Sequence, residues 1–327
     1  MTLYYCGIDE AGYGPMLGPL CVGRCVVRVE GHDPAANVPD LWERLSGRVC
    51  RTLKERRAGD HRLIPIGDSK KLKLANQSVR QHPLTHLERG VLCALSTAGA
   101  APDTDDELLG LLGAELPGEP WYASEPVRLP LGTERDDLAI DANLLRQGCR
   151  EAGIGFEDLA CRVIGEVEFN TTIERYRTKA AVTAGAVARH IRAIVDRWGG
   201  SDAAIRIVVD RLGARASYGP ILERAVPAAR VRAVAESPEC SAYVLDGLAA
   251  DLRVLFVTES ESAHLPAALA SMAAKLVREL SMRRLNAHFG AERDGLKPTA
   301  GYVTDARRWL AELRPDADLR RRLVRNA

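Results

Sequence analysis

Short apolar runs alternate with longer amphipathic segments along most of this chain of 327 residues. Apolar runs of about four to eight residues bounded by turns predict buried strands, and apolar residues three or four positions apart predict helices. We predict strands at residues 3–9, 20–29, 160–169, 204–210, 230–236 and 252–259. We predict helices at residues 78–97, 171–198, 216–226 and 262–288, the second of them capped by Asn170. Strands that alternate with helices are typical of an α/β protein.

One long region departs from this alternation. Residues 98–158 contain an acidic run, several prolines and a Pro-Trp-Tyr cluster, which predicts an insertion with some helix of its own. We expect no separate catalytic domain there. The preceding segment 67–72, GDSKKL, is predicted to be a loop.

The composition excludes some classes of function and leaves others open. The chain carries 45 basic and 44 acidic residues, so its net charge of +1 gives no overall attraction to nucleic acid. A nucleic-acid partner must therefore be met by local basic patches. No apolar run is long enough for a membrane span, and the N-terminus does not resemble a signal peptide. We expect a monomer in the cytoplasm that has no membrane partner.

The eight cysteines are scattered along the sequence and form no Cys-x-x-Cys pair. Several lie inside apolar runs. Reduced, buried thiols are the expectation, in preference to a zinc site or a disulfide framework.

Acidic residues recur at or just beyond the ends of predicted strands. Asp9 and Glu10 follow the first strand, Asp210 ends AIRIVVD, and Glu259 and Glu261 follow LRVLFVT. Carboxylates at neighbouring strand ends converge and repel each other unless a cation lies between them, and Mg²⁺ or Mn²⁺ suits such oxygen ligands. Two such ions can activate water for phosphodiester cleavage. The alternative for any single acid is a loop-facing or helix-capping carboxylate.

A glycine-rich turn directly follows the first acidic pair. Gly12, Gly14 and Gly18 have a spacing one residue longer than the dinucleotide-binding fingerprint, and no Gly-Lys-Ser/Thr follows. An acidic pair before the turn would also repel a pyrophosphate. The pattern therefore favours a close approach of the backbone to some other ligand.

These residues together resemble the motifs of the ribonuclease HII family. The matching segments occur in the family's order: GIDEAGYGPMLGP (7–19), DSKKL (68–72), Asp210 after two valines, ALASMAAKLVRE (268–279) and GYVT (301–304). The resemblance implies an RNase H-like fold, a mixed five-stranded sheet flanked by helices. It also implies a catalytic domain at 1–290, with insertions at about 98–158 and 211–258, and a C-terminal helical extension at 291–327.

The activity that the resemblance implies is endonucleolytic hydrolysis of RNA in RNA–DNA hybrids, or at ribonucleotides embedded in duplex DNA. By the same resemblance, two Mg²⁺ or Mn²⁺ ions are held by Asp9, Glu10, Asp210 and Glu261, with Glu259 as a rival to the last. The products would carry 3′-hydroxyl and 5′-phosphate ends.

The resemblance also implies the residues that bind nucleic acid. Main-chain groups of Gly12, Tyr13 and Gly14 would meet the 2′-hydroxyl, the group that distinguishes RNA from DNA. Tyr302 would stack on the sugar of the next nucleotide. Phosphates would be contacted by three residues of the second motif: Ser69, Lys70 and Lys71.

This sequence departs from the family in three places. Tyr13 stands where the family has arginine, and Glu261 stands where it has aspartate. Arg211 and Arg215 follow Asp210 where the family has Asp-Gly; four positions apart on one helical face, they could clamp a phosphate or form a surface ion-pairing face.

Basic residues also cluster on the helix predicted at 171–198, where they form either a strand-binding face or an ordinary charged solvent face: Arg175, Arg177, Lys179, Arg189 and Arg192. Two alternatives to the implied activity remain. One is a catalytically weak homologue that only binds nucleic acid, and the other is a nuclease of the same fold that acts on structured DNA.

Overall fold

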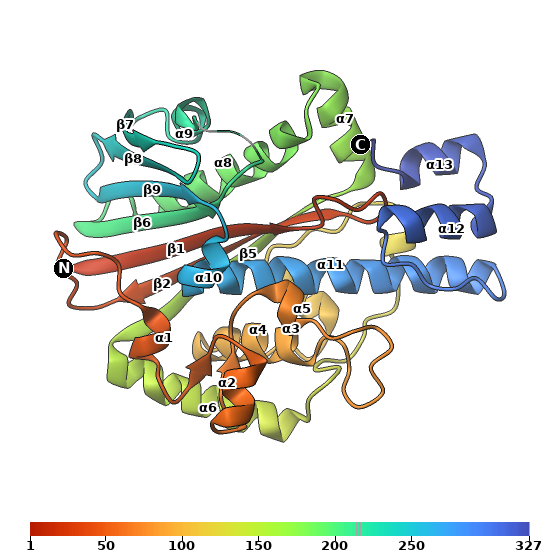
Figure 1. The fold of residues 1–327 in the computed structure, drawn as a ribbon, viewed down its shortest axis with the longest axis horizontal. Coiled ribbons are helices and arrows are strands. Elements are labelled where there is room, and N and C mark those ends of the chain that lie inside the picture. The colour runs from red at the N-terminus through yellow and green to blue at the C-terminus, as the bar shows by residue number, and fades with distance from the viewer. Residues whose placement is uncertain (214, 216, 327) are drawn as a thin grey trace.

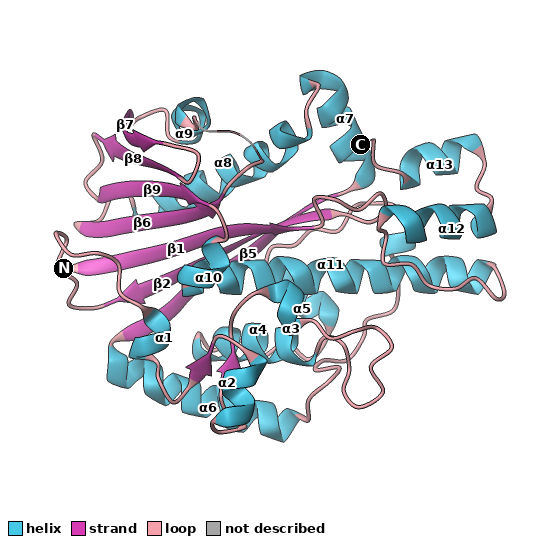
Figure 2. Ribbon diagram, in the orientation of Figure 1, coloured by secondary structure: helices cyan, strands magenta, loops and turns pink. Residues whose placement is uncertain are grey.

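The computed structural model describes residues 1–213, 215 and 217–326. Within them, seven strands form one mixed sheet in the order β5-β2-β1-β6-β9-β8-β7, with helices on both faces (Figures 1 and 2). The strands are β1 (Thr2–Ala11), β2 (Leu20–Val29), β5 (Ile154–Ile164), β6 (Ala203–Asp210), β7 (Arg230–Glu236), β8 (Cys240–Asp246) and β9 (Asp251–Val257). Two short strands, β3 (Val49–Cys50) and β4 (Ile64–Pro65), pair separately. The predicted α/β class is confirmed.

The helices fall into two groups by length. Five have more than ten residues and are α4 (Thr85–Thr97), α6 (Arg135–Ala152), α7 (Glu166–Tyr176), α8 (Lys179–Trp198) and α12 (Val303–Leu313), and a sixth, α11 (Leu265–Glu292), is the longest. The shorter helices are α1 (Leu41–Arg44), α2 (Leu53–Ala58), α3 (Ser69–Leu72), α5 (Asp105–Leu111), η1 (Pro120–Tyr122), α9 (Gly219–Ala225), α10 (Ser260–Ala263) and α13 (Ala317–Leu323).

The sheet is larger than the five strands that were predicted. Strands β1, β6 and β9 run parallel, and antiparallel strands extend the sheet at both edges. Without β7 and β8, five strands remain in the order β5-β2-β1-β6-β9. The two additional strands form a hairpin within the segment 211–258. The sequence prediction missed β8, whose buried residues Ser241, Tyr243 and Leu245 alternate with less buried ones.

Two apolar cores lie on opposite faces of the sheet. One side is covered by α11, with α4 and α6 beneath it, and the other by α8 and α9 (Figure 1). Alternate residues of β1 serve the two cores: Leu3 and Tyr5 face α11, while Cys6 and Ile8 face α8. This alternation is the period of two that a strand buried on both faces requires.

Helix α11 approaches the sheet closely because two strand positions have no side chain. A Cβ on Gly7 would lie 2.1 Å from the backbone nitrogen of Ala267, and one on Gly23 would lie 2.1 Å from the carbonyl oxygen of Ala270. Any other residue would push the helix outward. The small residues in the first half of α11 serve the same close contact.

Several predicted boundaries are wrong. The helix predicted at 78–97 begins only at Thr85, and the segment 67–72 contains the short helix α3, for which Asp68 is the N-cap. The strand predicted at 160–169 runs instead from Ile154 to Ile164. The helix predicted at 216–226 is shorter, and the last predicted strand ends at Val257.

The helix predicted at 171–198 is two helices. Helix α7 ends at Tyr176, the following Arg177 has a positive φ of 58° that stops the helix, and α8 begins after Thr178. Asn170 is not a cap; it lies within α7. Its buried amide donates to the carbonyl of Val324 and accepts from the backbone N–H of Asn326. A contact with the chain's far end therefore decides the position of this residue.

The region 98–158 packs onto the rest of the molecule. It contributes α5, η1 and α6, and Arg284 of α11 donates to the buried carboxylate of Asp105 over 2.7 Å. At the other end of the chain, α12 and α13 carry Trp309 and Leu323 into a third apolar cluster with Phe289 of α11. The same cluster contains Leu17, so the C-terminal helices pack next to the glycine-rich turn.

All eight cysteines are free thiols, and seven of them are buried, in agreement with the expectation from sequence. No helix among the described residues combines the length and apolar composition that a membrane span requires.

Candidate metal centre

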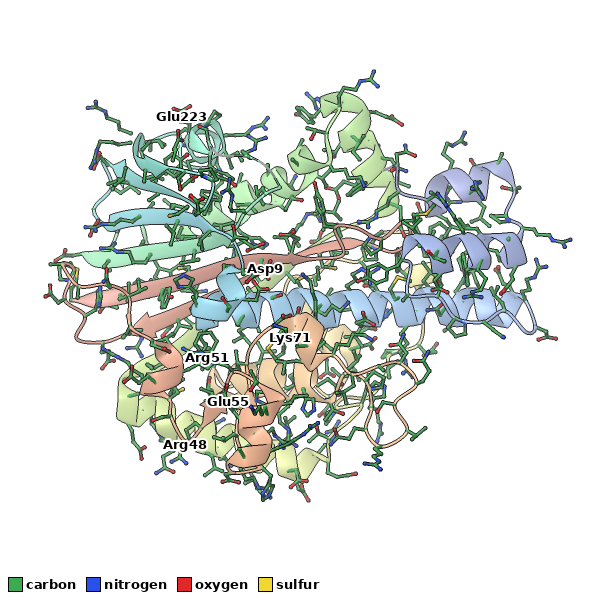
Figure 3. All side chains as sticks on the ribbon, in the orientation of Figure 1. Asp9, Arg48, Arg51, Glu55, Lys71 and Glu223 are labelled. Carbon is green, nitrogen blue, oxygen red and sulfur yellow. The ribbon has the colours of Figure 1, made fainter. Side chains whose placement is uncertain are left out.

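Three carboxylates meet where the two central strands stop pairing. The β1–β6 ladder ends at Ile8 and Val209, and the next residues are Asp9 and Glu10 on β1 and Asp210 at the end of β6. One oxygen from each carboxylate lies within 4.8 Å of the others. Asp9 lies near the centre of the molecule, beside α10 and α11 (Figure 3). The prediction that the acids of these two strands converge is confirmed.

The carboxylates are held in a region that disfavours their charge. Burial raises the pKa of Asp9 well above its usual range, and the charges of Glu10 and Asp210 raise it further. Burial, together with the charge of Asp210, raises the pKa of Glu10 to about 7. Burial also raises the pKa of Asp210. Like charges taken out of water favour protonation unless a cation neutralises them.

This donor set fits a divalent cation. Three carboxylates supply hard oxygen ligands, and burial together with their mutual repulsion raises the pKa values of Asp9 and Glu10. Mg²⁺ and Mn²⁺ prefer such oxygens, and ion binding would replace the repulsion by attraction.

The fourth acid predicted from sequence lies beside this group. Glu261 is half-buried on α10, and its charge contributes to the raised pKa values of Asp9 and Glu10. Glu259 is exposed and has a positive φ of 53° immediately before α10. The backbone N–H of the intervening Ser260 donates to Asp210 over 3.2 Å. Of the two rivals, Glu261 is therefore the one in electrostatic contact with the cluster.

The DSKKL segment lies against the same site. Asp68 accepts from the backbone N–H of Lys70 over 2.9 Å, and the buried hydroxyl of Ser69 lies 3.0 Å from that of Ser271 on α11. The positive charge of Lys70 acts on Glu10 and Asp210 and opposes the rise in their pKa values. Lys71 is exposed and pairs with Asp68 at 3.2 Å (Figure 3). Lys70 therefore faces the carboxylates, while Ser69 anchors the segment.

The glycine-rich turn is held by two buried arginines. Gly12 has a φ of +92°, and a Cβ there would lie 2.5 Å from Nε of Arg278. Arg278 donates to the carbonyls of Leu17 and Ala300 over 3.3 and 3.1 Å. Arg325 donates to the carbonyls of Gly12, over 2.6 Å, and of Pro15. The turn is thus fixed from α11 on one side and from the C-terminal segment on the other.

Sequence reasoning missed these two arginines. Arg278 lies within ALASMAAKLVRE, so its motif could have drawn attention to it. Arg325 lies outside every motif, and no pattern in the sequence pointed to it. Both stand far from the turn in sequence, and only the fold brings them there.

The aromatic residues expected to meet nucleic acid are accessible. Tyr13 is 36% exposed and Tyr302 is 52% exposed. Burial and the charge of Glu10 raise the pKa of Tyr13, so its ring lies near the carboxylates. Tyr302 follows Gly301, whose carbonyl accepts from the backbone N–H of Met16 over 2.8 Å. A side chain on Gly14 would meet open space, so this part of the turn can be approached from outside.

The placement of Arg211 and Arg215 on one helical face, which both the phosphate clamp and the ion-pairing face assumed, is wrong. The described residues between Asp210 and Gly219 are not helical; Ala214 and Ala216 lie outside the described residues. The guanidinium of Arg211 donates to the carbonyls of Arg215 and Ser237 over 2.6 and 3.3 Å. Arg211 is thus engaged in fixing this loop.

No family model matches the chain, and no curated protein matches it. Among solved structures, ribonuclease HII from Archaeoglobus fulgidus in complex with PCNA is 15% identical with a TM-score of 0.42, covering 98% of this chain and 93% of that one. Ribonuclease H2 from Pyrococcus horikoshii is 15% identical with a TM-score of 0.42, covering 95% and 86%. Bst-RNase HIII in complex with Mn²⁺ is 14% identical with a TM-score of 0.42, covering 99% and 66%. The structural neighbours thus include the family that the sequence motifs resemble.

Proposed function

We propose that this protein is a divalent-metal-dependent endonuclease that hydrolyses the RNA strand of RNA–DNA hybrids, or ribonucleotides embedded in duplex DNA. The observation that carries the proposal is the convergence within 4.8 Å of the buried Asp9 with the half-buried Glu10 and Asp210. Buried carboxylates in such contact are costly to a fold unless they bind something positive.

The segments that resemble ribonuclease HII motifs also meet around this one site, although they span most of the chain. Ser69 of the second motif contacts Ser271 of the fourth, and Arg278 of the fourth contacts Leu17 of the first. Gly301 of the last motif accepts from Met16 of the first. Residues far apart in sequence that gather at a single site support a common function.

The chain's own residues divide the work of the proposed reaction. Asp9, Glu10 and Asp210, with Glu261 beside them, would hold two Mg²⁺ or Mn²⁺ ions. When bound, such ions activate water for attack on a phosphodiester and stabilise the leaving oxygen. Lys70, which faces the same carboxylates, supplies positive charge to the substrate phosphate.

The turn after the carboxylates supports the choice of a ribose-containing substrate. Gly12 and Gly14 bring the backbone to the surface next to Glu10, where main-chain groups can hydrogen-bond to a 2′-hydroxyl. The exposed rings of Tyr13 and Tyr302 offer flat surfaces on which a base or sugar can stack. In this proposal the backbone of the turn, and not a side chain, distinguishes RNA from DNA.

A cleavage panel tests the proposal. The wild-type chain is incubated with an RNA–DNA hybrid, a DNA duplex that contains one ribonucleotide, and a branched DNA, each with Mg²⁺ and with Mn²⁺. We expect cleavage of the first two substrates, with products that carry 5′-phosphates, and none in EDTA. Asp210→Asn should remove this cleavage.

Three results would contradict the proposal in different ways. Undiminished cleavage by Asp210→Asn would show that another site or a contaminant performs the reaction. Cleavage of the branched DNA, regardless of ribose, would assign the protein to structured DNA. Tight binding without cleavage under either ion would favour a binding protein.

A further inference from the structure

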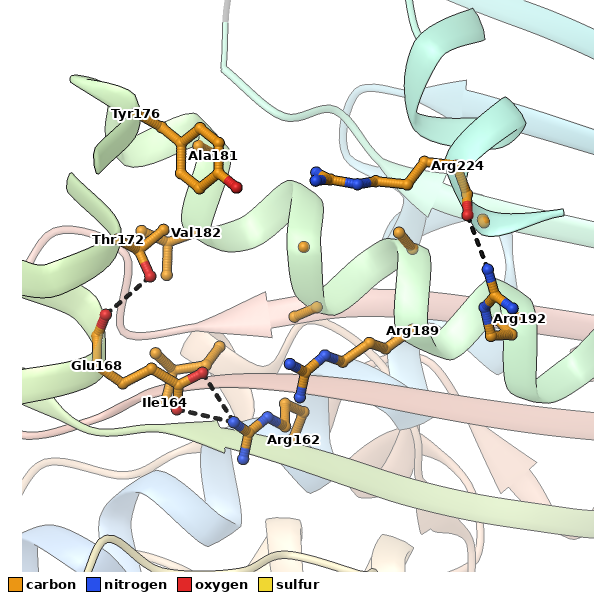
Figure 4. Close-up of a pocket in the computed structure, with 14 residues that line it drawn as sticks. Arg162, Ile164, Glu168, Thr172, Tyr176, Ala181, Val182, Arg189, Arg192 and Arg224 are labelled. Carbon is orange, nitrogen blue, oxygen red and sulfur yellow. Dashed lines mark hydrogen bonds and ion pairs between the residues drawn. The ribbon is translucent and has the colours of Figure 1, made fainter. Parts of the chain in front are cut away.

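A second charged feature lies away from the carboxylates, in a groove across helix α8. The groove has a volume of about 340 Å³ and is bounded by α7, α8, α9 and the end of β5. Four arginines line it: Arg162 from β5, Arg189 and Arg192 from α8, and Arg224 from α9 (Figure 4). We call this feature the arginine groove.

The arginine groove carries a local excess of positive charge. Glu168 pairs with Arg162 at 2.7 Å. Among the described residues, no carboxylate lies within ion-pairing distance of Arg189, Arg192 or Arg224. Arg192 instead donates to the carbonyl of Arg224 over 2.9 Å. Since the whole chain has a net charge of only +1, this excess is a local property of the groove.

The floor of the arginine groove is open because α8 carries small residues there. Ala181, Gly185 and Ala188 lie beneath the arginines. A Cβ added to Gly185 would meet nothing within 4 Å. Glycine inside a helix costs stability relative to alanine, by about 1 kcal/mol, so its presence calls for a reason. An open floor that a ligand can enter is such a reason.

The strand register places the groove beside the carboxylate site. Glu10 pairs with Val22 across β1 and β2, and Val22 pairs with Arg162 across β2 and β5. Directly paired residues point to the same face of a sheet, and adjacent strands lie about 5 Å apart. Arg162 is therefore two strands, or about 10 Å, from Glu10 on one sheet face. Val22, between them, is fully buried, so a polymer that contacts both sites would pass over the side chains that cover it.

The geometry points to the arginine groove as a second contact for the backbone phosphates of the nucleic acid that is cleaved at the carboxylate site. This inference rests on the proposed function. Planar guanidinium groups recognise phosphate oxygens through paired hydrogen bonds, and three of these four arginines have no described carboxylate partner. The ring of Tyr176 also lines the groove and is exposed, with the guanidinium of Arg175 5.3 Å from its centroid, so the face away from Arg175 is the one on which a base can stack.

Substitutions at the floor and at the rim of the groove distinguish an effect of its charge on binding from an effect on its structure. Gly185→Glu puts a carboxylate into the groove while all four arginines are kept, and Gly185→Ala is its neutral control. Arg189→Gln combined with Arg192→Gln removes two charges. Its matched control is Arg57→Gln combined with Arg150→Gln, two exposed arginines on α2 and α6, at the opposite side of the molecule (Figure 1).

The measurement is binding of the full chain to a fluorescein-labelled 20-base-pair DNA duplex that contains one ribonucleotide. Fluorescence anisotropy is recorded in EDTA, so that no hydrolysis occurs, over a series of salt concentrations. We expect Arg189→Gln with Arg192→Gln to weaken binding about tenfold and to reduce the slope of log K against log salt by about 2, one per lost phosphate contact. Gly185→Glu should weaken binding similarly, while both controls bind as the wild type does.

Unchanged affinity and salt slope in both groove variants would overturn the inference, even if cleavage depends on Asp210 as proposed. If the groove variants have altered salt slopes but the wild type cleaves no substrate, phosphate binding by the groove is supported and the proposed nuclease activity is contradicted. Inorganic pyrophosphate, titrated as a competitor, gives a further outcome. If it binds the wild type but not Gly185→Glu, while duplex binding is unaffected, the groove serves a small phosphorylated ligand and the inference is wrong.

Discussion

Two regions of this molecule gather like charges, and they differ in their access to water. In the carboxylate site, Asp9, Glu10 and Asp210 crowd together at the end of two buried strands, and their pKa values rise. In the arginine groove, Arg189 and Arg192 are exposed on one helix. Asp9 is buried and Glu10 and Asp210 are half-buried, so water screens the carboxylate charges less than it screens the arginine charges.

This difference predicts which of the two sites should change the free energy of unfolding. Burying like charges costs free energy that protonation or a bound cation offsets, so at a pH where the carboxylates are ionised the site should stabilise the fold with metal and destabilise it without. Exposed arginines cost little, so the groove should affect association with a polyanion and leave folding unchanged.

Asp9→Asn should have the largest effect, in opposite directions on activity and on metal-free stability. Cleavage should fall by about 10³-fold or more, because a bound metal ion is worth several kcal/mol in the transition state. In EDTA at pH 8, the melting temperature should rise, since a buried repulsion is removed. Mg²⁺ should raise the melting temperature of the wild type and not that of the variant.

The matched control is Asp196→Asn, which removes an exposed carboxylate on α8. It should change neither cleavage nor the response to Mg²⁺. If Asp9→Asn instead lowers the melting temperature in EDTA, the carboxylates do not repel each other in the folded chain, and the contrast with the arginine groove does not hold.

Glu166→Gln tests whether burial alone, away from the metal site, produces the same cost. Burial raises the pKa of Glu166 to about 7, and its carboxylate accepts from Tyr122 and from the backbone N–H of Gly18. The folded chain therefore retains this proton at a pH where the unfolded chain has lost it. The free energy of unfolding should fall between about pH 4.5 and 7, by about 3 kcal/mol from this group.

Urea denaturation at half-unit pH steps measures this slope. The glutamine variant keeps an acceptor for both donors but does not titrate, so its curve should be flatter over that window. Parallel curves for the wild type and the variant would show that Glu166 is ionised in the folded chain throughout, and that its burial is fully compensated.

The sequence predicted the carboxylate site well because its signal is local. Asp9, Glu10 and Asp210 each follow an apolar run, and parallel buried strands bring their ends together almost regardless of what surrounds them. For the same reason the positions of β1, β2 and β6 were predicted closely. Strand β7 was also predicted at 230–236, but its hairpin partner β8 was missed, because β8 buries the polar Ser241 and offers only a short apolar run.

The positions of other residues depend on contacts that no local pattern records. Asn170 looked like a helix cap, yet its amide binds residues 324 and 326. Arg325 holds a turn 313 residues away. The groove's arginines were recognised only as a basic stretch, since Arg162 and Arg224 come from other elements. Such long-range contacts become visible only once the chain is folded.

Arg325→Met compares a buried arginine with the exposed arginines of the groove. Its guanidinium donates to the carbonyls of Gly12 and Pro15, and burial lowers its pKa to about 10. Losing hydrogen bonds from a charged donor should reduce the free energy of unfolding by about 2 kcal/mol. Denaturant melts of Arg325→Met and of the charge-retaining Arg325→Lys measure this. A loss confined to cleavage, with unchanged stability, would mean that the turn folds without this anchor.

Glu261→Gln and Glu259→Gln define the edge of the carboxylate site. Glu261 is half-buried and its charge acts on Asp9 and Glu10, whereas Glu259 is exposed. Glu261→Gln should lower cleavage by about tenfold at limiting Mg²⁺, the range typical of a group that orients or supplements metal ligands. Glu259→Gln should leave the Mg²⁺ dependence unchanged. The opposite order of effects would transfer the fourth position to Glu259.

The smallest expected effect is that of the arginine groove on folding. Arg189→Gln with Arg192→Gln should change the free energy of unfolding by less than about 0.5 kcal/mol, because exposed side chains away from special contacts contribute little. Gly185→Ala should stabilise the fold by up to about 1 kcal/mol, since alanine favours a helix and its Cβ meets no neighbour. Both values come from the same urea melts as before. If the arginine pair instead costs as much as Arg325→Met, the groove is a structural element of α8. The arginines would then be needed for folding, and the two regions would no longer differ in whether their charges affect stability or binding.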